Sequence, residues 1–178
     1  MNSSEPQTRL VIRVEGSADE DAVRRVNLAA FDTGAEAQLV DALRAGGGLL
    51  LSLVAESGGE LVGHIAFSPV TLTSETTTLA GVGLAPLAVL PGHQRTGIGA
   101  KLVVDGLRRL REAGQLFCVV VGHATYYPRH GFQRASAFGV RWEEPVPDEV
   151  FMLQELASGS LAGVSGIVRY RPEFDEIE

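Results

Sequence analysis

The sequence predicts a mixed α/β fold that combines an antiparallel hairpin with a parallel crossover unit. Two β-rich segments, 49–55 and 61–73, are separated only by the turn Glu-Ser-Gly-Gly-Glu, which is typical of a hairpin. Between residues 84 and 121, a β-rich segment, a glycine-containing loop, an amphipathic helix and an apolar run follow one another. A strand that returns through a helix pairs in parallel with the next strand, so both kinds of pairing are expected.

The first fifty residues are expected to form one strand and two helices. Residues 10–14 are rich in β-favouring residues, and residues 19–31 then repeat apolar side chains at helical spacing. A second helical pattern over 35–44 ends at the three glycines 46–48, which are typical of a helix stop. A strand followed by two helices therefore precedes the hairpin.

The segment 84–90 is expected to be an irregular strand because it contains Pro86. Proline has no N–H to donate to a neighbouring strand, so it indicates a bulge or an unpaired edge. Such a defect would leave backbone groups free to bind a ligand.

The region 96–112 has the clearest helical pattern in the chain. An apolar stripe faces one way and charged residues face the other, and the helix is expected to end at Gly114. The following run 116–121 is apolar throughout, as in a strand buried on both faces of a sheet. Two later segments, 151–156 and 166–170, are compatible with strands.

Composition narrows the class of protein. A chain of 178 residues is the usual size of one domain, so residues 1–178 are expected to form one. The formal charge of −7 argues against nucleic acid as a partner, which requires clustered Lys and Arg. The single cysteine, Cys118, lies in an apolar run and indicates a buried strand residue in a reducing compartment. With neither a secretory signal nor a membrane-length apolar stretch, we expect a cytoplasmic protein that does not contact membranes.

The segment 94–100, Gln-Arg-Thr-Gly-Ile-Gly-Ala, has the composition of a phosphate-binding loop at the start of a helix. The first N–H groups of a helix lack partners and its dipole is positive at that end, so both favour a phosphate. Arg95 adds a cation, and the Thr96 hydroxyl is expected to cap the helix or bind a phosphate oxygen. The segment has neither the nucleoside triphosphate loop nor the third glycine of a dinucleotide site, and the hairpin argues against a nicotinamide-dependent oxidoreductase.

Two motifs resemble those of the GNAT N-acetyltransferases. Leu87-Ala88-Val89-Leu90-Pro91 followed by segment 94–100 is similar to the Gln/Arg-x-x-Gly-x-Gly/Ala motif with which that family binds acetyl-coenzyme A. Tyr127 stands four residues before the pair Gly131-Phe132, as a tyrosine does in the family, at the expected separation from the first motif. The segment 62–70 and the pair Tyr126-Tyr127 also resemble the YhbS-like branch.

The resemblance implies a fold and a set of site residues. It implies a mostly antiparallel, twisted central sheet that splays at the parallel pair of strands and is flanked by helices, with a motif core of about 9–140 and C-terminal strands over 141–178. Acetyl-coenzyme A would be the co-substrate, with no metal. The implied coenzyme-binding residues are Leu87, Ala88, Val89, Gln94, Arg95, Thr96, Gly97, Ile98, Gly99 and Ala100.

The resemblance also implies direct transfer of an acetyl group to a primary amine in a ternary complex. Tyr127 is the expected general acid for the departing thiolate, with Tyr126 as the alternative. The general base is left open between His64, His123 and a water chain, and His93 is expected to be a solvated loop residue. The alternative function is a noncatalytic acyl-coenzyme A sensor.

The acceptor is a small-molecule or peptide amine whose identity the motifs leave open, as they do the use of other acyl groups and a possible homodimer. Asp32, Glu36 and Asp41 flank the expected acceptor side, where they would attract a cationic amine, although a solvated helix face is the simpler interpretation.

Overall fold

The computed structural model describes residues 9–176. The expectation that the N-terminal segment carries no secretory signal concerns mainly residues 1–8, which lie outside the described residues. Nine strands and three α-helices are present in the described part of the chain. The helices are α1 (Glu20–Ala30), α2 (Ala35–Ala45) and α3 (Ile98–Glu112). The strands are β1 (Leu10–Val14), β2 (Leu51–Ser57), β3 (Glu60–Thr73), β4 (Thr78–Val89), β5 (Phe117–Val121), β6 (Gln133–Arg134), β7 (Val140–Trp142), β8 (Phe151–Glu155) and β9 (Gly166–Arg169).

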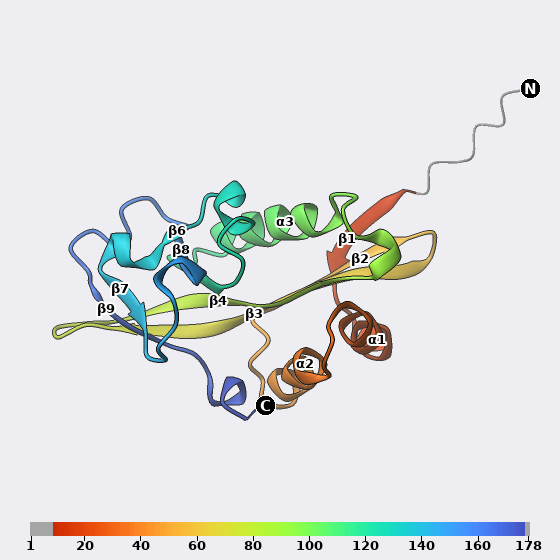
Figure 1. Ribbon diagram of the computed structural model, residues 1–178, viewed down its shortest axis with the longest axis horizontal. Helices are drawn as coiled ribbons and strands as arrows, with labels where there is room; N and C mark the ends of the chain where they lie inside the picture. The colour runs from red at the N-terminus through yellow and green to blue at the C-terminus, as the bar shows by residue number, and fades with distance from the viewer. Residues whose placement is uncertain (1–8, 177–178) are drawn as a thin grey trace, which may run out of the picture.

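The strands form one mixed sheet in the order β1-β2-β3-β4-β5-β8-β6, with β9 paired to both β3 and β7. Neighbours are antiparallel except for the pairs β4–β5 and β7–β9. Helix α3 covers one face of the sheet, whereas α1 and α2 lie on the other face, near the C-terminal end of the chain (Figure 1). The expected hairpin and parallel crossover are both confirmed.

The pair β4–β5 opens after a short contact. Only Val82 with Cys118 and Gly83 with Val119 are in register, and beyond them the two strands separate. Across β4, the register with β3 shifts between Ile65 and Phe67, which face Leu87 and Leu84. Residues 85 and 86 of β4 therefore lie opposite the single residue Ala66 of β3, and the bulge predicted at Pro86 is confirmed.

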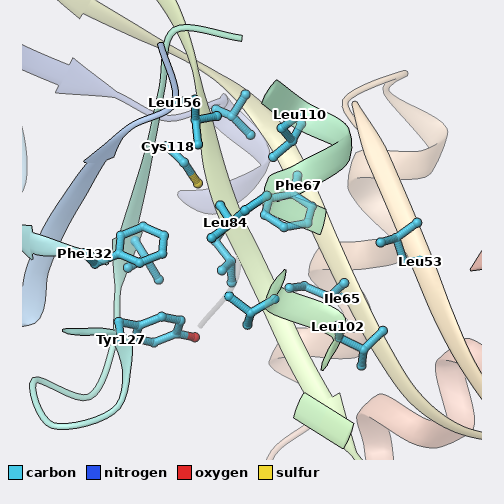
Figure 2. Close-up of a cluster of buried hydrophobic side chains, with 14 of the residues drawn as sticks. Leu53, Ile65, Phe67, Leu84, Leu102, Leu110, Cys118, Tyr127, Phe132 and Leu156 are labelled. Carbon is cyan, nitrogen blue, oxygen red and sulfur yellow. The ribbon is translucent and has the colours of Figure 1, made fainter. Parts of the chain in front are cut away.

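The main core lies between α3 and the sheet. Leu102 and Leu110 of α3 pack with Ile65 and Phe67 of β3 (Figure 2). Gly106 allows this close approach, because a Cβ there would lie 2.6 Å from the Phe67 ring. The apolar stripe of α3 therefore brings the segment before it onto the edge of β4.

Cys118 is fully buried on β5, as the sequence indicated. Burial raises the pKa of its thiol well above the usual range, because a thiolate would be poorly solvated there. The residue is a packing residue of the core.

Several segments differ from the sequence-based expectation. Strand β4 begins at Thr78 instead of residue 84, and α3 begins at Ile98 instead of Thr96. The missed half of β4 contains Gly81, where a Cβ would lie 2.2 Å from the Phe117 ring, so packing requires a residue that weakens the strand pattern. Strands β6 and β7 are two and three residues long, too short to produce a periodic signal.

Candidate active site

A cleft of about 980 Å³ lies where β4 and β5 separate. It is lined by the segment before α3, by the open edge of β4, by the loop after β5 and by residues from the first two helices and the C-terminal segments. The volume is at the upper end of about 300–1,000 Å³ that is usual for ligand sites. One continuous cleft thus joins elements from both faces of the sheet.

The loop before α3 has an unusual backbone. Arg95 has a φ of 62°, and no other non-glycine residue in the described chain has a positive φ. Gly97 is the N-cap of α3 and has a φ of 89°. Left-handed backbone at a non-glycine residue is energetically costly and is concentrated at ligand sites.

The N–H groups of this loop are free to bind an anion. Among residues 9–176, no hydrogen bond is donated by the N–H groups of residues 95–100, and the first such bond in α3 runs from Lys101 to the carbonyl of Gly97. These unpaired N–H groups stand at the positive end of the α3 dipole. The geometry suits a phosphate group.

Side-chain hydrogen bonds hold the loop 94–97 in place. The Gln94 side-chain amide donates to the carbonyl of Val89 at 3.0 Å, which joins the loop to the end of β4. The Thr96 hydroxyl donates to the carbonyl of His93. The expectation that Thr96 caps α3 is therefore wrong: Gly97 occupies the N-cap position, where no side chain bonds to the helix.

The edge of β4 that faces the cleft has free backbone groups. The N–H of Leu90 donates to the carbonyl of Val62, so in this antiparallel pair Leu90 and Ala88 direct their backbone groups toward β3. Leu87 and Val89 then direct theirs away from β3, on the side where β5 has separated. Because the Val89 carbonyl already accepts from Gln94, the free groups predicted over 87–89 are reduced to the N–H and carbonyl of Leu87 and the N–H of Val89.

Most of the predicted coenzyme residues meet at this cleft. Those that line it are Leu87, Val89, Gln94, Arg95, Gly97, Gly99 and Ala100. Three do not: the Ala88 side chain is buried on the opposite side of the strand, Ile98 packs into the core, and Thr96 is exposed outside the cleft.

Tyr127 lines the cleft opposite β4. It begins the short 3-10 helix Tyr127–His130, which ends at Gly131 with a φ of 90°, and its ring packs edge-on against Phe132. The side chain points from its loop toward the strand that carries Leu84 (Figure 2). Burial and, to a lesser degree, the neighbouring Tyr126 raise the pKa of the phenol well above its usual value. The phenol is therefore protonated at neutral pH and available as a proton donor.

Tyr126 occupies a different part of the cleft. Its ring is nearly perpendicular to that of Tyr127, with centroids 5.1 Å apart, and its hydroxyl lies over the first turn of α3, where a Cβ on Gly99 would be 3.1 Å away. The two adjacent tyrosines thus face different neighbours.

His64 does not reach the cleft. It is fully buried on β3, where its two ring nitrogens lie 3.0 Å from the Asn27 amide and 2.9 Å from the Ser52 hydroxyl. Burial lowers its pKa, although nearby Glu15 opposes that shift. His64 is a hydrogen-bonded core residue, whereas His123 and His93 line the cleft.

The cleft continues beyond Tyr127 into an arm that the sequence did not reveal. Besides Glu36, which was considered from the sequence, this arm is lined by Phe31, Leu39, Trp142, Tyr170 and Phe174. These aromatic and aliphatic residues come from distant segments without periodicity, so only the folded chain brings them together. Asp41 forms ion pairs with Arg24 and Arg44, and neither Asp41 nor Asp32 lines the cleft.

The described residues contain no group of three or more His, Cys, Asp and Glu side chains placed to hold a metal ion. Over the same part of the chain, none of the helices is both long and apolar enough to cross a bilayer.

A helix N-terminus with free N–H groups, an open strand edge and a protonated phenol around one cleft define a protein suited to a phosphate-bearing coenzyme with a linear, hydrogen-bonding arm. Comparisons with known proteins agree with this class. Residues 50–134 match the family described as acetyltransferase (GNAT) domain. The chain is 37% identical over 167 residues to the uncharacterized N-acetyltransferase YhbS of Escherichia coli K12, covering 93% of this chain and 99% of that one.

Solved structures give the same result. The crystal structure of Escherichia coli YhbS in complex with CoA matches with a TM-score of 0.91 and 36% identity, covering 98% of this chain and 96% of the other. A GNAT-family acetyltransferase from Brucella melitensis in complex with acetyl-CoA matches with a TM-score of 0.78 and 36% identity, over 94% and 99% of the two chains. This chain belongs to the GNAT acetyltransferase family, and its sheet has the GNAT fold.

Proposed function

We propose that the protein transfers the acetyl group of acetyl-CoA to a primary amine by direct attack within a ternary complex. The observation that carries this proposal is the single cleft in which the loop 94–100, the open edge of β4 and Tyr127 face one another. Similar proteins of known structure bind CoA and acetyl-CoA. The proposal therefore joins a family-level activity to named residues of this chain.

The coenzyme is assigned to the loop and the strand edge. Its pyrophosphate is held by the free N–H groups of residues 95–100 and by Arg95. Its pantetheine arm contains amide groups, which pair with the backbone groups of Leu87 and with the Val89 N–H as another strand would. This placement directs the thioester toward Tyr127.

The reaction forms a C–N bond and breaks a C–S bond. The lone pair of the neutral amine attacks the thioester carbonyl carbon, and the collapse of the tetrahedral intermediate expels the thiolate of CoA. Tyr127 donates its phenolic proton to that thiolate, and the proton lost by the amine nitrogen replaces it through solvent. The products are an acetamide and CoA with a free thiol.

Removal of a proton from the incoming ammonium group requires an acceptor or an aqueous path. Of the two histidines considered as bases, only His123 lines the cleft, since His64 is fully buried on β3. The base is therefore assigned to His123 or to water within the cleft.

The test replaces Tyr127 with Phe and measures both free-thiol release and the Kd for acetyl-CoA. We expect turnover to fall by about 10²–10⁴-fold, the range for loss of a general acid, with little change in the Kd. Tyr126→Phe tests the alternative acid, and its turnover should fall far less than that of Tyr127→Phe. Unchanged turnover in Tyr127→Phe would remove Tyr127 from the mechanism, whereas tight coenzyme binding without thiol release across a broad amine panel would favour a noncatalytic sensor.

A further inference from the structure

Part of the cleft is lined by residues from outside the phosphate-binding loop, β4 and the Tyr127 loop, and we call this part the acceptor arm. Its residues are Phe31, Glu36, Leu39, Trp142, Tyr170 and Phe174. Glu36 and Leu39 belong to α2, and Phe31 follows α1; both helices lie on the face of the sheet opposite α3 (Figure 1). The acceptor arm therefore shares no residue with the site assigned to the coenzyme.

The walls of the acceptor arm are aromatic rings in mutual contact. The ring of Tyr170 lies 5.5 Å from Trp142 and 4.8 Å from Phe174 between centroids, at interplanar angles of 65° and 56°. Gly83 allows Tyr170 to lie against β4, because a Cβ there would be 2.6 Å from the ring. Such a surface favours a flat apolar group, which can stack on some rings and meet others edge-on.

Charge in the acceptor arm is confined to one carboxylate. Glu36 is the only acidic residue among those lining the cleft, and no ion pair of Glu36 is present within residues 9–176. Its nearest polar contact is the Thr33 hydroxyl at 3.5 Å, which is a weak hydrogen bond. The carboxylate is thus available to a cation from outside.

From this arrangement we infer the class of acceptor, an inference that rests on the proposed function. The acceptor is a primary amine that carries one cationic centre and a flat apolar body, as in an arylalkylamine. The aromatic rings of the acceptor arm hold the apolar body, and Glu36 attracts the ammonium group into the cleft, where its neutral form reacts.

Other acceptor classes fit the acceptor arm less well. A polyamine or an aminoglycoside carries several ammonium groups, which one carboxylate cannot balance. A sugar also requires many hydrogen-bonding partners, whereas five of the six side chains of this arm are aromatic or aliphatic.

The first experiment measures binding without turnover. Trp142 is the only tryptophan of the chain and lines the acceptor arm, so its fluorescence reports on ligands there. The protein, saturated with CoA, is titrated with 2-phenylethylamine, spermidine, kanamycin and trialanine. We expect 2-phenylethylamine to bind at least about tenfold more tightly than the others, a difference that one well-placed aromatic contact and one charge can supply.

Two pairs of variants test the two parts of the inference. Glu36→Gln should raise the Kd for 2-phenylethylamine about tenfold, the usual effect of losing a hydrogen bond to a charged group. The Kd for the neutral analogue 2-phenylethanol should change by no more than about twofold. Asp32→Asn, a nearby carboxylate outside the cleft, is the control. Phe174→Leu should weaken the binding of both ligands. Phe138→Leu changes a residue outside the cleft and should leave the binding of both unchanged.

Tighter binding of spermidine, kanamycin or trialanine than of 2-phenylethylamine would overturn the inference. So would equal effects of Glu36→Gln on the amine and on the alcohol. The same panel assayed for thiol release separates this result from failure of the proposed function: release with another amine class overturns only the acceptor assignment. Binding of 2-phenylethylamine with no release from any amine supports the acceptor arm and overturns catalysis.

Discussion

The ring of Tyr127 lies directly against Gly122, so closely that a Cβ on Gly122 would be 2.4 Å from the ring carbon Cε2. Gly122→Ala should therefore displace the phenol from its position in the cleft. Because misplacement of a reacting group by about 1 Å can cost 10²-fold, we expect kcat to fall between about tenfold and one hundredfold. Steady-state thiol release measures this change, and equilibrium binding should show a nearly unchanged Kd for acetyl-CoA.

The control for that substitution is Gly92→Ala. A Cβ on Gly92 meets nothing within 4 Å, and its φ is not positive, so alanine fits without strain. An equal loss of kcat in both variants would show that the contact with Tyr127 is not the cause.

Arg95→Gln should weaken binding of the coenzyme without altering the chemical step. Loss of one charge-assisted bond to phosphate is expected to raise the Kd for acetyl-CoA about tenfold, and less at high salt. S-acetyl-N-acetylcysteamine, a thioester without phosphates, should react equally well with wild type and variant. Lys101→Gln is the control, since this cation in the first turn of α3 lies outside the cleft. A larger loss with the truncated thioester would contradict an electrostatic role for Arg95.

Tyr170→Phe should stabilise the free protein or leave its stability unchanged. The Tyr170 hydroxyl is buried, and within the described chain it has no hydrogen-bond partner. Burial, followed by the nearby Cys118 and Tyr127 groups, raises the pKa of this phenol far above its usual value. Removing a buried, unpaired hydroxyl should raise the free energy of unfolding by up to about 1 kcal/mol, measured by denaturant titration. A loss above about 1 kcal/mol would indicate that the hydroxyl has a partner, and half-buried Tyr126 provides the comparison through Tyr126→Phe.

Glu15→Gln should destabilise the protein in a pH-dependent manner. Burial alone would raise the pKa of Glu15, but hydrogen bonds from Ser52 and Arg44, together with the His64 ring at 3.7 Å, outweigh it and lower the pKa from 4.5 to about 2. A depressed folded-state pKa adds stability that is complete above the unfolded value and is lost as the pH falls toward 2. We expect a cost of about 2 kcal/mol at pH 7 that shrinks steadily below pH 4.5, measured by denaturant titration at several pH values.

The matched control for Glu15 is Glu143→Gln, which removes an ion pair with Arg169 at the surface. Exposed pairs contribute about 0–1 kcal/mol, so this variant should show a small effect with little dependence on pH. Equal pH profiles for the two variants would contradict the buried network around Glu15.

Local patterns predicted the elements that form the coenzyme half of the cleft. Each of three sequence features constrains the backbone within a few residues: the apolar stripe of α3, the glycines of the loop 94–100, and Pro86. The helix, the loop and the bulge are found at the positions that these features predict. Thr96 shows the limit of such local reasoning. A Thr beside a helix start usually predicts a cap, but with the left-handed Gly97 as N-cap the helix starts at Ile98, and the Thr96 hydroxyl donates to the carbonyl of His93 instead.

The acceptor arm could not be predicted in this way. Phe31 follows α1, Trp142 ends a three-residue strand and Tyr170 follows β9, so no single segment has a pattern that marks the site. For His64, the sequence favours a hydrogen-bonded strand residue over a general base but leaves the base open. Only the packing of β3 against β2 and α1, which places His64 against Ser52 and Asn27, distinguishes the two.

The opening between β4 and β5 also bears on self-association. A strand edge with unpaired N–H and C=O groups is a template for other strands, and many sheets protect such edges to avoid aggregation. Here the free groups of Leu87 and Val89 lie within the sheet, between the paired ends of β4 and β5 and the residues around Tyr127, and not on its outer strand β1. A neighbouring molecule therefore meets the rim of the sheet first, so the protein can keep an unpaired edge for a linear ligand without presenting it to copies of itself.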